Sequence, residues 1–131
     1  MWSGGGIAKT SNALEGGVVM KIKPGASVRG LEPEMLIGLA VVEEVFAKGN
    51  IPLVVTEGTG GTHMPGSLHY EGLAVDIRSR DIAPAAIETV RKEIYAALGN
   101  DDKLGIKSEF DFVVEGDHFH LEFQPKGPQS K

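Results

Sequence analysis

Apolar residues recur every three or four positions in two stretches of the chain, and this spacing predicts two amphipathic helices. The first is expected within residues 31–50, because proline and glutamate stand near its start and Gly49-Asn50 follows its last apolar position. The second is expected within residues 83–100, which end in another Gly-Asn pair. The apolar positions are Met35, Leu36, Leu39, Val42, Val45 and Phe46 in the first helix, and Ile87, Val90, Ile94 and Leu98 in the second. Each helix is expected to cover a hydrophobic core.

Two further stretches predict strands at the centre of the chain. Residues 52–56 form a short apolar run that is typical of a buried strand. Residues 73–78 alternate, which predicts a strand with two different faces. One face carries Leu73, Val75 and Ile77, and the other carries Ala74, Asp76 and Arg78. The polar, glycine-rich loop 57–68 between the two strands is either a simple connection or the rim of a site.

The C-terminal part of the chain predicts an antiparallel hairpin. Its two strands are "FDFVV" and "HFHLEF", joined by a Glu-Gly-Asp turn at residues 115–117. In the second strand, one face carries Phe119, Leu121 and Phe123, and the other carries His118, His120 and Glu122. The hairpin therefore turns two histidines toward the same side of the sheet.

These elements together predict an α+β fold in which helices pack against a mainly antiparallel sheet. A chain of 131 residues is long enough for one domain with a single core. We expect that domain to span residues 20–125. Residues 1–19, rich in glycine, serine and asparagine, are expected to form a flexible N-terminal extension, and residues 126–131 a flexible tail.

Composition excludes several classes of function. The chain has no cysteine, so any metal site needs histidine and carboxylate ligands. Its net charge of −5, with scattered lysines and arginines, argues against a nucleic-acid partner. Membrane spanning is not expected, because no apolar run approaches the roughly 20 residues that a bilayer requires. No signal peptide is apparent at the N-terminus, so we expect cytoplasmic synthesis.

The histidines suggest a metal site. Because His118 and His120 are two positions apart on a strand, their side chains start roughly 7 Å apart on one face. Asp76 would lie beside the two histidines if its face of the central strand adjoins theirs, and His69 could join them. These nitrogen and oxygen ligands suit a zinc ion whose fourth coordination position stays open. Residue spacing alone also allows ordinary core or surface histidines and a hydrogen-bonding aspartate. Three of the four histidines nevertheless fall within residues 66–81 and 115–123.

Two motifs resemble those of the LAS zinc metallopeptidases, which include D-alanyl-D-alanine carboxypeptidases, dipeptidases and phage L-alanyl-D-glutamate endopeptidases. "SLHYEGLAVD" resembles their Ser-x-His-x-x-Gly-x-Ala-x-Asp pattern. "DHFHLEF" is similar to their second motif, in which an acidic residue stands three positions before the last zinc histidine. "VTEG" at 55–58, the first motif, and "FDFV" leading into "HFH" also resemble segments of Hedgehog signalling domains in the same order. The resemblance covers about residues 50–123.

The resemblance implies a Hedgehog/DD-peptidase-like fold with a Zn²⁺ cleft, in which His69, Asp76 and His120 are the ligands. It further implies that Asp117 is the catalytic acid and that His118 is a second catalytic residue. Glu115, in the same turn, is the alternative acid, and the two roles are exchangeable.

The same comparison gives candidates for substrate binding. His63 matches a Hedgehog histidine six residues before the first ligand, and Ser67 opens the first motif. Many LAS peptidases carry an arginine in the segment that here reads "TEGTGGTHMPG", where arginine is absent; Arg78 or Arg80 would have to replace it. Only Glu57 matches the calcium cluster of Hedgehog domains, whereas a calcium site needs six to eight oxygen ligands.

The function implied is that of a zinc-dependent, monomeric peptidase that hydrolyses peptidoglycan stem peptides in the cell wall. Both a D-Ala-D-Ala carboxypeptidase and an L-Ala-D-Glu endopeptidase fit, and a phage or prophage lysis enzyme, an endolysin, is one source. The alternative is a non-catalytic, zinc-stabilised Hedgehog-like binding module. Asp117 favours the peptidase, because the Hedgehog motif has no acid at this offset.

Overall fold

Five strands form one mixed sheet in the computed structural model, which describes residues 20–125. The strands are β1 (Met20–Ile22), β2 (Leu53–Glu57), β3 (Ala74–Arg78), β4 (Phe110–Glu115) and β5 (His118–Phe123), in the order β1-β2-β3-β5-β4. Three neighbouring pairs are antiparallel, which confirms a mainly antiparallel sheet. The exception is β1, which was not predicted and runs parallel to β2. The expected extension 1–19 and tail 126–131 lie outside the described residues.

Both predicted helices form, and both are shorter than the stretches that predicted them. Helix α1 (Pro33–Lys48) has proline at its first position and ends before Asn50, whose φ of 57° is the left-handed conformation that asparagine tolerates. In the second stretch a 3₁₀ turn, η2 (Pro84–Ala86), precedes α2 (Ile87–Ala97). Within residues 20–125, neither helix has the length and apolar character needed to cross a bilayer.

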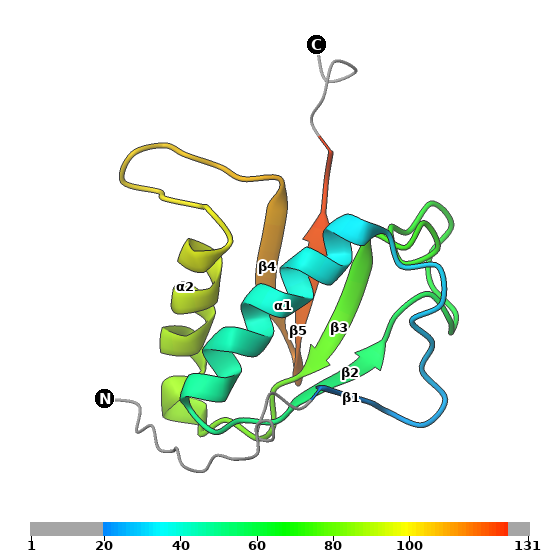
Figure 1. Cartoon of the computed structure of the whole chain (residues 1–131), viewed down its shortest axis with the longest axis horizontal. Helices are drawn as coiled ribbons and strands as arrows, with labels where there is room; N and C mark the ends of the chain where they lie inside the picture. The colour runs from blue at the N-terminus through cyan, green and yellow to red at the C-terminus, as the bar shows by residue number, and fades with distance from the viewer. Residues whose placement is uncertain (1–19, 126–131) are drawn as a thin grey trace.

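The two helices lie on one face of the sheet and enclose the core there (Figure 1). Helix α1 contacts β5, and α2 contacts β4 and α1. The predicted apolar positions of α1 are buried except Leu36, which is 57% exposed. This part of the prediction was wrong because Leu36 lies about 100° around the helix from its buried neighbour Met35.

Alternation along β3 and β5 separates the core from the polar face, as predicted. Val75 and Ile77 of β3 are fully buried, and so are Phe119 and Leu121 of β5. A one-residue shift would exchange these faces, so the register must be fixed. The two-residue loop Gly116-Asp117 fixes it by pairing Glu115 with His118, and the positive φ of Gly116, 62°, suits such a tight turn. The histidines of β5 consequently point away from the helices.

Candidate metal centre

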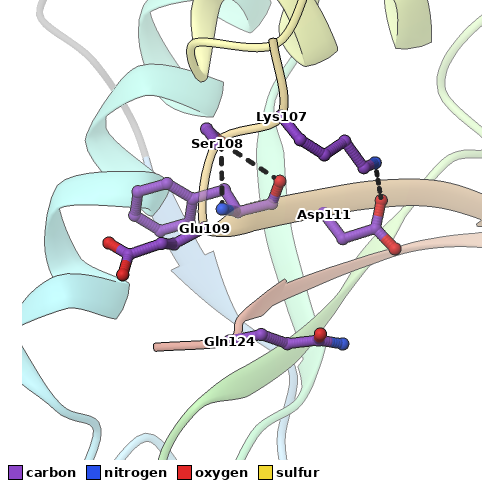
Figure 2. Close-up of a pocket in the computed structure, with 6 residues that line it drawn as sticks. Lys107, Ser108, Glu109, Asp111 and Gln124 are labelled. Atoms are coloured by element: carbon purple, nitrogen blue, oxygen red, sulfur yellow. Dashed lines mark hydrogen bonds and ion pairs between the residues drawn. The ribbon is translucent and has the colours of Figure 1, made fainter. Parts of the chain in front are cut away.

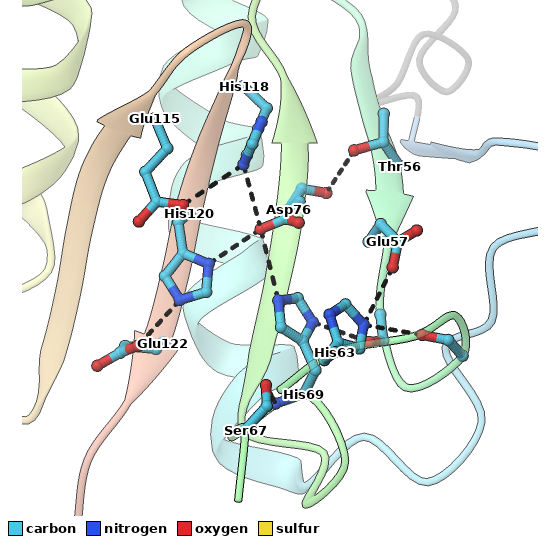
Figure 3. A network of polar contacts seen from close by, with 12 residues as sticks. Thr56, Glu57, His63, Ser67, His69, Asp76, Glu115, His118, His120 and Glu122 are labelled. Atoms are coloured by element: carbon cyan, nitrogen blue, oxygen red, sulfur yellow. Dashed lines mark hydrogen bonds and ion pairs between the residues drawn. The ribbon is translucent and has the colours of Figure 1, made fainter. Parts of the chain in front are cut away.

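Strand pairing brings two of the predicted ligands together. Asp76 of β3 and His120 of β5 are register partners, and Nδ1 of His120 lies 2.9 Å from Oδ1 of Asp76. His69 arrives from the loop between β2 and β3, with Nε2 3.6 Å from the same oxygen. One ligand atom from each of the three residues lies within 4.8 Å of the others (Figure 3). The structure thus assembles the His69–Asp76–His120 cluster that the sequence predicts.

The β2–β3 loop holds His69 through several local contacts. Gly58 follows β2 at a point where a Cβ atom would lie 2.1 Å from the carbonyl oxygen of Ser27, so only glycine fits. The Gly58 carbonyl accepts a hydrogen bond from Nδ1 of His69 at 2.9 Å. Ser67 Oγ accepts a bond from the His69 backbone N–H at 3.1 Å. His69 is only 5% exposed, and its remaining nitrogen faces Asp76.

The donor set fits a zinc ion. Two ligand atoms bound to tetrahedral zinc stand about 3.3 Å apart, given zinc–ligand bonds of about 2.0–2.1 Å. The two nitrogen-to-Oδ1 distances, 2.9 Å for His120 and 3.6 Å for His69, lie on either side of this value. Each imidazole also has its other nitrogen anchored, by Gly58 in one case and by Glu122 Oε1 at 2.9 Å in the other. Such anchoring is the usual arrangement around zinc histidines.

The three side chains shift one another's pKa values. The hydrogen bond to Asp76 raises the pKa of His120 to about 9, with a further contribution from Glu122, against the opposing effect of burial. Burial lowers the pKa of His69, but its contacts with Asp76 and Gly58 outweigh burial and raise the pKa overall. Burial raises the pKa of Asp76, yet the two histidines hold it well below its ordinary range. A cation bound by His120 would therefore compete with the proton that this imidazole holds below about pH 9.

His118 extends the cluster toward two acidic side chains. Its Nε2 lies 3.8 Å from Oδ1 of Asp76 and 3.5 Å from Oε1 of Glu115. Its Nδ1 lies 3.2 Å from Asp117, whose side chain is 98% exposed and whose pKa this contact lowers. Glu115 thus contacts the ring nitrogen that faces the cluster, whereas Asp117 contacts the opposite one. The sequence motif favours Asp117 and leaves Glu115 as the alternative acid, whereas in the structure Glu115 is the one on the cluster side of His118.

The other candidates lie around this centre in distinct positions. The ring of His63 stacks on His69, with centroids 4.0 Å apart. Ser67 supports the backbone of His69, as described above. Arg78 is the register partner of His118, and its Nε lies 3.1 Å from Oδ2 of Asp81. Sequence reasoning missed Tyr70, whose hydroxyl bonds to the backbone of His63; its only signal was its place beside His69 in the motif.

A separate hollow of about 250 Å³ lies where β4 begins (Figure 2). It is lined by Lys107, Ser108, Glu109, Phe110, Asp111 and Gln124. None of these residues is a histidine or belongs to the cluster. Gln124 nevertheless hydrogen-bonds Glu122, the residue that anchors His120. The hollow is therefore distinct from the metal centre, although one polar link joins them.

No protein-family model and no curated protein matches this chain.

Proposed function

We propose that the protein is a zinc-dependent peptidase that hydrolyses peptidoglycan stem peptides. The observation that carries this proposal is the convergence of His69, Asp76 and His120, with His118 and an acidic side chain directly beside them. Three protein ligands are what a catalytic zinc site uses, because its fourth position serves water or substrate. The two sequence motifs described above supply the substrate class.

The residues around the cluster match the needs of peptide hydrolysis. A bound zinc ion would lower the pKa of a coordinated water molecule and polarise a peptide carbonyl. Glu115 or Asp117 would accept a proton from the attacking water and pass it to the leaving amine. His118 would donate a hydrogen bond to the oxygen that becomes negatively charged in the transition state. Glu115 is the acid closer to the cluster, because it contacts Nε2 of His118, the ring nitrogen that faces Asp76.

The substrate reaches the site from the polar face of the sheet under this proposal. Arg78 is the register partner of His118 and is a candidate cation for a substrate carboxylate, although it is engaged with Asp81. The segment 56–66 offers no arginine for the same purpose. Because Arg78 is paired with Asp81 and the segment 56–66 has no arginine, an endopeptidase is favoured over a carboxypeptidase, which must bind a free C-terminal carboxylate. Action on a cell wall, as by a phage lysis enzyme, follows from the substrate.

The test is digestion of purified peptidoglycan and its soluble stem peptides by the zinc-loaded wild type, with products identified by mass spectrometry. A defined new terminus, absent after chelation and restored by zinc, is the expected result and identifies the bond. Asp76→Asn is the matched control, since it removes one ligand while it keeps nearly the same shape. Intact substrate after incubation with protein that holds one zinc per chain would overturn the proposal.

One observation favours a second candidate, a zinc-stabilised binding module. The side chain of Asp117, which matches the peptidase acid, is 98% exposed and contacts the nitrogen of His118 that faces away from the cluster. In a binding module the metal would stabilise the polar face without turnover. This candidate predicts stoichiometric zinc, a higher melting temperature with zinc, and no cleavage of any stem peptide.

A further inference from the structure

His63 and His69 form a closely stacked pair beside the cluster. Their ring centroids are 4.0 Å apart and the rings are within 2° of parallel (Figure 3). One flat face of His69, a buried ligand, is therefore covered by another imidazole. His69 has a hydrogen bond at Nδ1 to Gly58, which fixes the direction of its ring but leaves rotation about that bond to be restrained by packing. The stack supplies that restraint.

His63 is itself fixed at both ring and backbone. Its Nε2 donates to the Gly60 carbonyl at 2.9 Å and lies 3.1 Å from Oε1 of Glu57. The hydroxyl of Tyr70 accepts a hydrogen bond from the His63 backbone N–H at 2.6 Å and donates to the His63 carbonyl at 2.9 Å. The Tyr70 ring also meets the His63 ring edge to face, with centroids 5.4 Å apart.

These contacts join two parts of the β2–β3 loop beside His69. Tyr70 follows His69 directly in the chain, so the residue next to the ligand holds the residue that stacks on the ligand. Within the loop, the Ser67 N–H bonds to the Met64 carbonyl and Tyr70 N–H bonds to the Ser67 carbonyl. A half-exposed tyrosine whose hydroxyl makes two bonds to one backbone unit is a specific device for holding that unit.

We propose that Tyr70 and His63 form a clamp that holds the imidazole of His69 in its ligating orientation, so that both are positioning residues for the zinc ion. The inference builds on the metal site of the proposed function, and it assigns His63 a role toward the metal in place of direct substrate binding. It does not depend on whether the zinc protein cleaves peptides. Partners of this kind, outside the ligands themselves, typically contribute 10–100-fold to metal affinity.

The test compares zinc affinity, by competition with a chromophoric chelator, in the wild type and in Tyr70→Phe, His63→Ala and His63→Phe. We expect Tyr70→Phe to bind zinc on the order of 10-fold more weakly, and His63→Ala more weakly still. His63→Phe keeps a flat ring on His69 and should recover part of the loss. Met64→Ala is the matched control, because Met64 lies in the same loop and is 79% exposed.

Two further readouts separate positioning from general stability and from substrate binding. The free energy of unfolding of the chelator-treated variants should stay close to that of the wild type, and the absorption spectrum of the cobalt-loaded Tyr70→Phe protein should differ from that of the wild type. Unchanged zinc affinity in Tyr70→Phe and His63→Ala would overturn the proposal, and so would a loss matched by Met64→Ala or by equal destabilisation without metal. Peptidase failure alone, with these affinities reduced, would leave the clamp established and remove only the proposed function.

Discussion

The carboxylate of Asp76 meets the imidazole of His120 across two neighbouring strands, with Oδ1 of one 2.9 Å from Nδ1 of the other. The contact follows from strand pairing, since the two residues are directly opposite in the β3–β5 register. Directly opposite side chains on one face of an antiparallel pair are close enough to interact without any special loop. The sheet itself therefore supplies two of the three candidate ligands, and only His69 depends on a loop.

This relationship predicts that Asp76 is required for metal binding. The wild type should hold one zinc per chain after dialysis, and Asp76→Asn should hold little, because the charged oxygen common to both histidine contacts is lost. Metal content by mass spectrometry checks this. Asp81→Asn, a carboxylate beyond the end of the same strand, serves as the control. Equal zinc in Asp76→Asn and the wild type would show that the metal lies elsewhere.

The two acids beside His118 give a second prediction. Glu115→Gln should lower the peptidase kcat by about 10²–10⁴-fold, because removal of a general base has effects of this size. Asp117→Asn should have the smaller effect, since Asp117 contacts the ring nitrogen that faces away from the cluster. Both variants should keep their zinc. The reverse order of activity, in zinc-replete proteins, would assign the proton transfer to Asp117.

The stability of the metal-free protein should depend on pH through Asp76 and His120. The pKa of His120 is raised from 6.5 to about 9, so its stabilising contribution is complete below about pH 6.5 and is lost as pH rises through about 9. The pKa of Asp76 is lowered from 3.8, so its contribution is present above that value and is lost as pH falls below it. The pair should therefore stabilise the fold most between these limits.

Melting temperatures of chelator-treated wild type and Asp76→Asn, measured from pH 4 to pH 10, test this dependence. The difference between the two proteins should be larger at pH 5.5 than at pH 9.5. An equal difference at both values would mean that the ion pair does not contribute to folding.

A fourth prediction concerns the residue between the two histidines of β5. Phe119 is fully buried, and its ring lies near those of Phe112 and Phe46, with centroid distances of 4.9 and 6.2 Å. Phe119→Ala should lower the free energy of unfolding by about 3–5 kcal/mol, a large share of the total for a small domain. Leu36→Ala, on the exposed side of α1, should change it by less than about 0.5 kcal/mol. Urea denaturation measures both, and similar losses would contradict the core assignment.

The cluster was predictable from sequence because two of its three residues, Asp76 and His120, follow from periodicity. Alternation in 73–78 and in 118–123 fixes which side chains share a face, and the motif supplies the remaining ligand, His69. By contrast, β1 has only three residues, all exposed, and so lacks an apolar signal. The stacking of His63 on His69 was likewise hidden, because it depends on the path of a glycine-rich loop and on a tyrosine hydroxyl bonded to backbone.

The same reasoning explains why the sequence could rank the two acids only by their offset from His120, which favoured Asp117. Glu115 is the last residue of β4 and Asp117 lies in the turn, so one is oriented by the sheet and the other by the turn. Offset along the chain carries no information on which nitrogen of His118 each acid approaches. Only the three-dimensional path shows that they approach opposite nitrogens of one imidazole.

The tight Gly116-Asp117 turn has a consequence for how the protein reaches its native state. Since the turn fixes the β4–β5 register, a hairpin closed one residue out of place would bury His118 and His120 and turn Phe119 to the solvent. Such a chain would lack two of the side chains that the proposed zinc site and peptidase activity need. Cobalt added during refolding would therefore report, through its colour, the moment at which the strands acquire their correct alignment.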